Sequence, residues 1–138
     1  MDPSSSAAFD ARARLVALRK ALLDLHKALL AETRASHERL FGPVPSTAAL
    51  LELVTADPWF AWLHPLTELI VGIDEALDAD VPPGAEALDA LQRRTNALVA
   101  GDAETEGFAR SYRDALQRDP AIAIAHAAVR RQLDALKR

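Results

Sequence analysis

Proline and glycine divide the hydrophobic pattern of the chain into helical segments. Residues 7–41 contain neither, and apolar positions recur there at helical spacing, so we expect a single helix about 50 Å long. The run Gly-Pro-Val-Pro at 42–45 ends this helix. Further helices are predicted over residues 47–56, 59–79 with a kink or a brief restart near His64, 85–100, 103–118 and 121–136. The expected caps are Ser46 or Thr47, Asp57, Asp102 and Asp119 at N-termini and Gly101 at a C-terminus.

Composition agrees with a helical protein. Among 138 residues, 29 are alanine and 21 are leucine, whereas valine and isoleucine together number only 11. We therefore predict an all-α fold: an up-and-down helical bundle of four main helices plus one or two short helices. Residues 1–6 are predicted to be a flexible N-terminus, and residues 7–138 a single helical-bundle domain.

The first predicted helix has an apolar face about 180° wide, broad enough to contact two neighbouring helices. One edge consists of Leu18, Leu22, Leu25 and Leu29, and the other of Val16, Leu23, Leu30 and Phe41. A polar seam runs between these edges at heptad spacing and consists of Arg12, Arg19, His26 and Thr33, with His37 beside it.

The polar seam has two interpretations. In the first, Arg12, Arg19 and His26 line a pocket for an anionic ligand, because arginine presents a rigid fork of donors. His126, on the core side of the last helix, joins that pocket if the two helices are adjacent. In the second, the seam faces a groove between helices, the arginine side chains extend outward, and His26 bonds a backbone carbonyl.

Three of the seven aromatic residues, Trp59, Phe60 and Trp62, lie within four positions. Such residues serve either as core or as anchors of a partner or ligand surface. At helical spacing, the predicted core stripe is Trp59, Leu63, Leu66, Ile70, Ile73 and Leu77. Phe60 and Val71 lie about 100° from this stripe and are candidates for a second contact. The opposite side, with His64, Glu68 and Glu75, is expected to face solvent.

The last helix begins with a segment that is apolar on every side. Residues 121–129 read AIAIAHAAV, and Ile122 and Ile124 lie on opposite faces. A helix of this kind must be covered all round, which one small core does not easily provide. We therefore expect a homodimer, with Ile124, Trp59, Phe60 and Trp62 as candidate interface residues.

Several classes of chemistry find no support in the residues. The absence of cysteine excludes disulfides, thiolate metal sites and thiol catalysis. Glycine-rich phosphate loops and nucleophile elbows are missing, and His26 and His37 would be about 16 Å apart on one helix, too far to share a metal. His64 and Glu68 have the spacing found in hemerythrin-like bundles, but Pro65 intervenes and the chain has only four histidines. We expect no catalytic residues, metal or cofactor.

Charge and hydropathy restrict the expected partners and location. Residues 68–106 carry 2 basic and 10 acidic groups, and residues 107–138 carry 7 and 3, an arrangement unlike a basic nucleic-acid footprint. The most apolar windows, 58–67 and 120–129, are ten residues long, about half of a membrane span. No secretory signal is visible, so we expect a cytoplasmic protein that binds neither nucleic acid nor membrane.

Residues 57–74, DPWFAWLHPLTELIVGID, resemble a segment of short uncharacterised bacterial proteins, and the similarity extends to QRDP at 117–120. This resemblance implies a bacterial, all-helical protein and assigns no site residues.

The leading interpretation is a non-enzymatic protein-interaction or assembly module, homodimeric and able to bind a further protein partner. The alternative is a small-molecule or anion-binding bundle, with a possible enzymatic activity, in which Arg12, Arg19, His26 and His126 line a pocket.

Overall fold

The computed structural model describes the backbone of residues 3–101 and 106–136 and the side chains of residues 10–101 and 107–136. Within these residues the chain is all-α and contains no strand. The helices are α1 (Pro3–Phe41), α2 (Thr47–Ala56), α3 (Pro58–Ala61), α4 (His64–Asp78), α5 (Ala85–Ala100), α6 (Glu106–Arg118) and α7 (Pro120–Leu136). The predicted fold class is confirmed.

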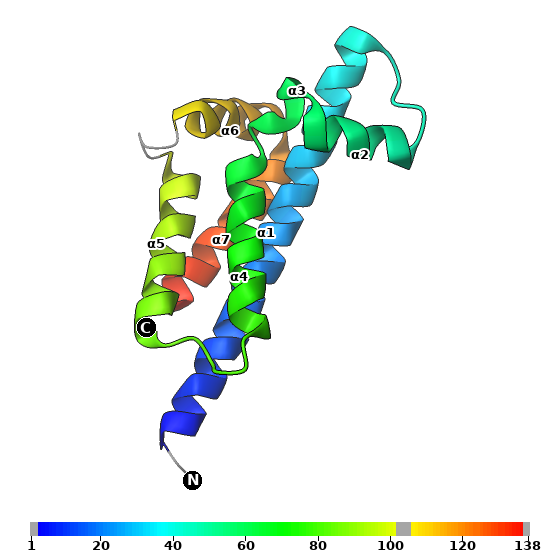
Figure 1. Ribbon diagram of the computed structural model, residues 1–138. Coiled ribbons are helices and arrows are strands. Elements are labelled where there is room, and N and C mark those ends of the chain that lie inside the picture. Colours follow the sequence, from blue (N-terminus) through cyan, green and yellow to red (C-terminus); the bar gives the residue numbers. More distant parts are fainter. Residues whose placement is uncertain (1–2, 102–105, 137–138) are drawn as a thin grey trace.

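Four helices, α1, α4, α5 and α7, form a ring in which each contacts two others (Figure 1). α1 runs the length of the molecule between α4 and α7, so it has the two neighbours expected. Its buried apolar face is narrower than predicted: Leu18, Leu22, Leu25 and Leu29 are buried, whereas Val16, Leu23 and Phe41 on the other predicted edge are 46%, 36% and 65% exposed. α6 crosses one end of this ring, and α2 projects to the side near the C-terminal end of α1. No helix in the described ranges is both long and apolar enough to span a bilayer.

The helix boundaries follow from local capping chemistry. Side-chain oxygens of Ser46, Asp57 and Asp119 accept hydrogen bonds of 2.8–3.1 Å from backbone N–H groups two or three residues further on. Gly101 ends α5 in the left-handed region, with φ at 78°, where a side chain would be strained. These predicted caps are confirmed, whereas Asp102 lies outside the described residues.

The core runs through the ring and is built mainly from leucine and isoleucine. Its fully buried members include Leu18, Leu22, Leu25, Leu29, Leu63, Leu66, Ile73, Ile122, Val129 and Leu133. Tyr112 on α6 and Phe60 on α3 close the same end of this core.

The break between α3 and α4 changes the expected exposure of two aromatic residues. The helix stops at Ala61 and restarts at His64, which confirms the predicted restart, but the predicted faces ignored this break and placed residues 58–79 on one continuous wheel. Phe60 is consequently completely buried and is not available as an interface residue, contrary to the prediction. Trp59, predicted for the core stripe, is 36% exposed.

The first half of α7 is covered on one side only. Ile122, Ala125 and Val129 are buried against the ring, whereas Ile124 on the opposite face is 70% exposed. The expectation that every side is covered is not met within one copy of the chain.

Candidate functional site

The predicted polar seam lies between α1 and α4. Arg12 Nη1 donates a hydrogen bond of 2.7 Å to the carbonyl oxygen of Leu77, near the C-terminal end of α4. One turn earlier on α4, Asp74 forms an ion pair with Arg19. Both arginines therefore bond to α4, and Arg12 also places a positive charge at the negative end of its helix dipole.

The two candidate histidines face different helices. His26 Nε2 lies 3.3 Å from the hydroxyl oxygen of Thr67 on α4, whereas His126 Nδ1 lies 2.6 Å from the hydroxyl oxygen of Tyr112 on α6. Burial lowers the pKa of His26 and raises that of Tyr112. Burial, followed by the charge of Arg130, also lowers the pKa of His126. Neutral His126 can therefore accept a hydrogen bond from the Tyr112 hydroxyl in the tautomer that carries its proton on Nε2.

These contacts favour the second interpretation of the seam, with one difference: His26 bonds a hydroxyl group and not a backbone carbonyl. None of the three surface hollows described for this structure is lined by Arg12, Arg19, His26 or His126. The role of these four residues in ligand binding stays a prediction.

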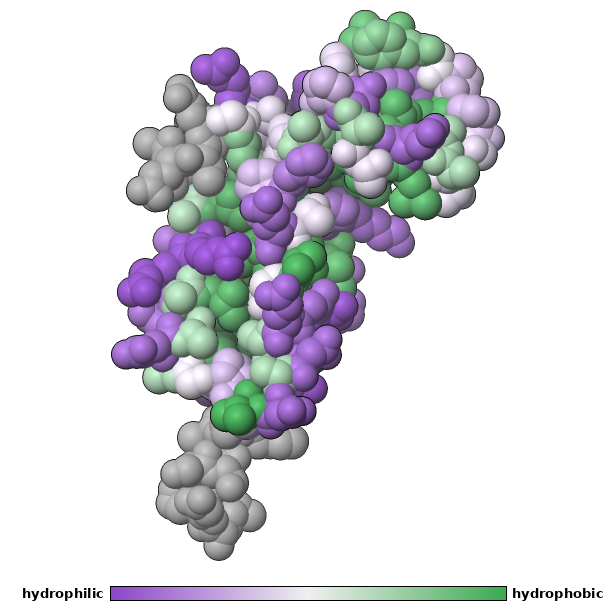
Figure 2. Space-filling view, in the orientation of Figure 1, coloured by the Kyte–Doolittle hydropathy of each residue, from purple (hydrophilic) through white to green (hydrophobic). Residues whose placement is uncertain are grey.

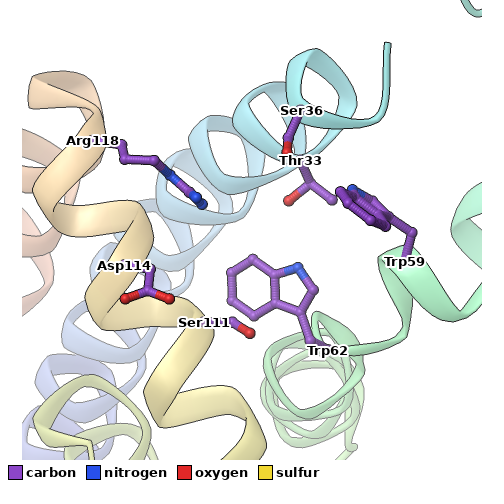
Figure 3. A pocket seen from close by; sticks show the side chains of 7 residues that line it. All are labelled: Thr33, Ser36, Trp59, Trp62, Ser111, Asp114 and Arg118. Atoms are coloured by element: carbon purple, nitrogen blue, oxygen red, sulfur yellow. The ribbon is translucent and has the colours of Figure 1, made fainter. Parts of the chain in front are cut away.

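A hollow of about 270 Å³ lies instead between α1, α3 and α6 (Figure 3). Its lining residues are Thr33, Ser36, Trp59, Trp62, Ser111, Asp114 and Arg118. Side chains from all three helices and from the α3–α4 turn surround the same space (Figure 3). We call it the tryptophan cavity.

Ring contacts hold the two indoles of the tryptophan cavity in place. Trp62 stacks at a tilt on Phe108 of α6, with ring centroids 5.5 Å apart. Trp59 meets Phe41 edge-on at 5.7 Å and His37 edge-on at 6.2 Å. These separations lie within the favourable range for aromatic pairs. The ring contacts therefore hold both indoles in place as walls of the cavity.

The other wall carries charge. Arg118 Nε lies 3.3 Å from Glu32 Oε1, and Arg39 Nη2 lies 3.6 Å from the same oxygen. The Glu32 side chain is only 14% exposed, and this oxygen has ionic neighbours but no aligned hydrogen bond. Asp114 forms no ion pair or hydrogen bond with any residue whose position is described. The cavity therefore presents the carboxylate of Asp114 beside the guanidinium of Arg118, which shares the single carboxylate of Glu32 with Arg39.

Hydroxyl groups complete the lining. Thr33 is buried and donates to the carbonyl oxygen of Leu29 at 2.7 Å, which leaves its oxygen able to accept. Ser36 and Ser111 form no hydrogen bond to the described part of the protein. Polar groups that lack a protein partner at a partly enclosed surface remain available to water or to a ligand.

An apolar surface adjoins this cavity. We define the apolar end as Leu40, Phe41, Leu51 and Trp59, which are 65%, 65%, 60% and 36% exposed. Hydrophobic residues cover the end of α1 and lie among polar residues over α2 (Figure 2). A shallow hollow of about 380 Å³, lined by Ala49, Glu52, Leu53, Ala56, Asp57 and Pro58, extends along α2.

Sequence reasoning found part of this region. Trp59 and Trp62 were candidates, and the structure brings both to the tryptophan cavity. Ser111, Asp114 and Arg118 were missed, although their spacing of three and four residues places them on one side of a helix. Without the neighbouring helices, that row is indistinguishable from an ordinary solvated face.

Comparison with protein-family models, with curated proteins and with solved structures finds no significant match. Among the residues that the structure describes, no three histidine or acidic side chains converge as metal ligands would. The role of the site must therefore be argued from its own geometry.

Proposed function

We propose that this chain is a non-enzymatic protein-interaction module that forms a homodimer through its apolar end. The observation that supports this proposal is α2, an apolar helix in which no residue is buried. Its inner residues Leu50, Leu53 and Val54 are only partly covered, and Leu51 points away from the core.

Physical chemistry disfavours leaving such a surface open. Apolar residues exposed singly are ordinary, but exposed aromatic side chains in mutual contact, as Phe41 and Trp59 are, are typical of interaction sites. Phe41 and Trp59 are already oriented by their mutual edge-on contact, so little conformational entropy is lost when a partner covers them. Aromatic side chains of this kind supply much of the binding energy at interfaces.

The charge distribution favours a second copy as the partner. Between residues 42 and 67 the chain carries only two charged side chains, Glu52 and Asp57, and no basic one. Such a surface can meet itself with little like-charge repulsion and offers no strong attraction to a highly charged partner. Leu51 lies at the middle of the ten-residue α2, so a two-fold axis there would pair Leu51 with its own copy.

The proposed setting is the bacterial cytoplasm. The resemblance of residues 57–74 to a segment of short bacterial proteins supports the bacterial origin. The acidic stretch at 68–106 supports a role without nucleic acid.

Sedimentation equilibrium tests the proposal directly. The wild-type chain of 14.9 kDa should sediment as a dimer at micromolar concentration. Leu51→Glu should raise the dimer dissociation constant at least about tenfold, because it places a charge at the centre of an apolar interface. Val71→Glu is the matched control, since Val71 is 47% exposed on α4, away from the apolar end.

Three results would contradict the proposal. The first is a wild-type monomer at about 100 μM, a concentration at which even a weak dimer is populated. The second is an equal loss of dimer in both variants. The third is a dimer that survives Leu51→Glu and dissociates on Ile124→Glu, which would move the interface to the outer face of α7 predicted from the sequence.

A further inference from the structure

We infer that the tryptophan cavity binds a small zwitterion that carries a quaternary ammonium group and a carboxylate. This inference does not depend on dimerisation. Size is the first restriction: about 270 Å³ corresponds to roughly nine water molecules in the liquid, so the cavity suits a compact molecule of about ten heavy atoms.

The aromatic wall accounts for the ammonium group. Trp59 and Trp62 both point into the cavity (Figure 3), and indole has the most favourable ring face for a cation. The carboxylate of Asp114 lies on the opposite wall and pairs with no described residue. A cation between the indoles and Asp114 would gain the ring attraction and also neutralise that carboxylate.

The guanidinium of Arg118 can bind the carboxylate of the ligand. Its Nε lies beside Glu32, whereas its terminal nitrogens point toward the cavity (Figure 3). Guanidinium groups bind carboxylates through two parallel hydrogen bonds. The free hydroxyls of Ser36 and Ser111 add donors that can complete the solvation of the anionic end.

The charge balance favours a ligand with no net charge. Asp114 and Glu32 supply two negative charges, and Arg118 and Arg39 supply two positive charges. A purely cationic ligand would meet Arg118, and a purely anionic ligand would meet Asp114. A zwitterion satisfies both charged walls at once.

The chain provides its own reporter for this binding. It contains two tryptophans, Trp59 and Trp62, and both line the cavity, so intrinsic tryptophan fluorescence reports on this site. The probe is glycine betaine, a quaternary ammonium carboxylate, titrated to about 20 mM to cover millimolar affinities. We expect a saturable change in fluorescence, and isothermal titration calorimetry should give the same dissociation constant.

Two further probes separate the charges. Choline carries the ammonium group alone and acetate the carboxylate alone, so each should bind at least about tenfold more weakly than betaine, a loss of one charged contact. Choline binding as tight as betaine binding would overturn the zwitterion assignment. Absence of a saturable response to betaine would overturn the inference altogether.

Variants localise the binding. Asp114→Asn removes the free carboxylate and should weaken betaine binding at least about tenfold without unfolding the protein, because Asp114 stabilises no other described residue. The matched control is Asp134→Asn, an exposed aspartate on α7 that should bind betaine like the wild type. Equal affinities in these two variants would contradict the site.

A second pair of variants tests the indoles and the guanidinium. Arg118→Gln should lower betaine affinity and leave choline affinity unchanged or improved, since it removes the partner of the ligand's carboxylate while Arg39 remains beside Glu32. Trp59→Phe keeps a ring and should weaken binding less than Trp59→Ala. Repeating the titrations with Leu51→Glu separates this inference from the proposed dimer: binding should persist in the monomer.

Discussion

α2 and α4 contain the same number of aliphatic residues but lie in different environments. α2 contains seven residues of the set Ala, Val, Leu and Ile among ten, and α4 contains seven among fifteen. α2 nevertheless buries no residue, whereas α4 buries Leu66, Leu69, Ile70 and Ile73. The more apolar of the two helices is therefore the less covered.

Their positions in the fold explain this difference. α4 lies between α1 and α5 in the ring, so its apolar stripe meets helices on both sides. α2 contacts chiefly the four-residue α3, which is too short to cover a helix face. Burial therefore depends on the neighbouring helices, and an apolar helix with few neighbours marks a place where another molecule can bind.

The largest expected effect comes from truncating one leucine in each helix and comparing the free energies of unfolding. Leu66→Ala on α4 should lower the free energy of unfolding by about 3 kcal/mol, because it empties a fully buried site. Leu51→Ala on α2 should change it by about 0.5 kcal/mol or less. Urea unfolding followed by circular dichroism, in dilute protein where a dimer is dissociated, measures both. Similar losses in the two variants would refute the contrast.

A polar contact attaches α6 to α7 of the ring. Tyr112 is 1% exposed, and its hydroxyl reaches His126 Nδ1 at 2.6 Å. Tyr112→Phe should lower the free energy of unfolding by about 1 to 2 kcal/mol. The aromatic side chain still packs in the core, but the half-buried Nδ1 of His126 loses its hydrogen-bond partner. The same urea experiment gives the value. No loss would mean that water replaces the hydroxyl.

Removal of a helix cap should cost more stability at α3, which leads into the core, than at the exposed α2. Asp57→Ala should destabilise the protein by about 1 kcal/mol, because Asp57 begins the segment that carries buried Phe60. Ser46→Ala should cost less, about 0.3 kcal/mol, since α2 can fray while the ring stays folded. Hydrogen exchange should correspondingly be faster in α2 than in α4. A larger loss from Ser46→Ala would show that α2 is coupled to the core.

The smallest expected effect is a dependence of the protein's stability on pH, which arises from two histidines on α1 and α7. Burial lowers the pKa of His26 and His126 below the ordinary value of about 6.5, so the unfolded chain binds more protons than the folded one just below that pH. Stability should be full above pH 6.5 and fall as the pH decreases toward the folded-state values. Thermal melts across this range should show the loss, and His26→Gln with His126→Gln should reduce it.

Local signals made much of the fold predictable. Pro58 and Pro120 follow aspartate caps, and both sites begin helices as expected. α1 has the two neighbours expected, but its double-width apolar face was wrong, because the edge that contains Val16, Leu23 and Phe41 is exposed. The error at Phe60 arose because α3 and α4 were placed on one helical wheel across Pro65. A break in a helix rotates the faces on either side of it relative to each other.

The candidate site was less predictable because its parts are distant in sequence. Trp59 and Arg118 line one cavity although 59 positions separate them. Arg19 pairs with Asp74 across 55 positions, and nothing along the chain distinguishes this aspartate from its neighbours Glu75 and Asp78. Only the packing of the helices selects such partners.

The sequence by itself determined most helix ends and which residues share a face within one unbroken helix, although α1 begins at Pro3 and not at residue 7. Those properties depend on backbone hydrogen bonds, caps and proline geometry within a few residues. The tertiary structure alone decided which apolar faces are covered, leaving α2 open and Phe60 enclosed, and which polar side chains meet in the tryptophan cavity. Coverage requires contact between segments far apart in the chain, and the hydrophobic effect acts on the surface that remains after packing.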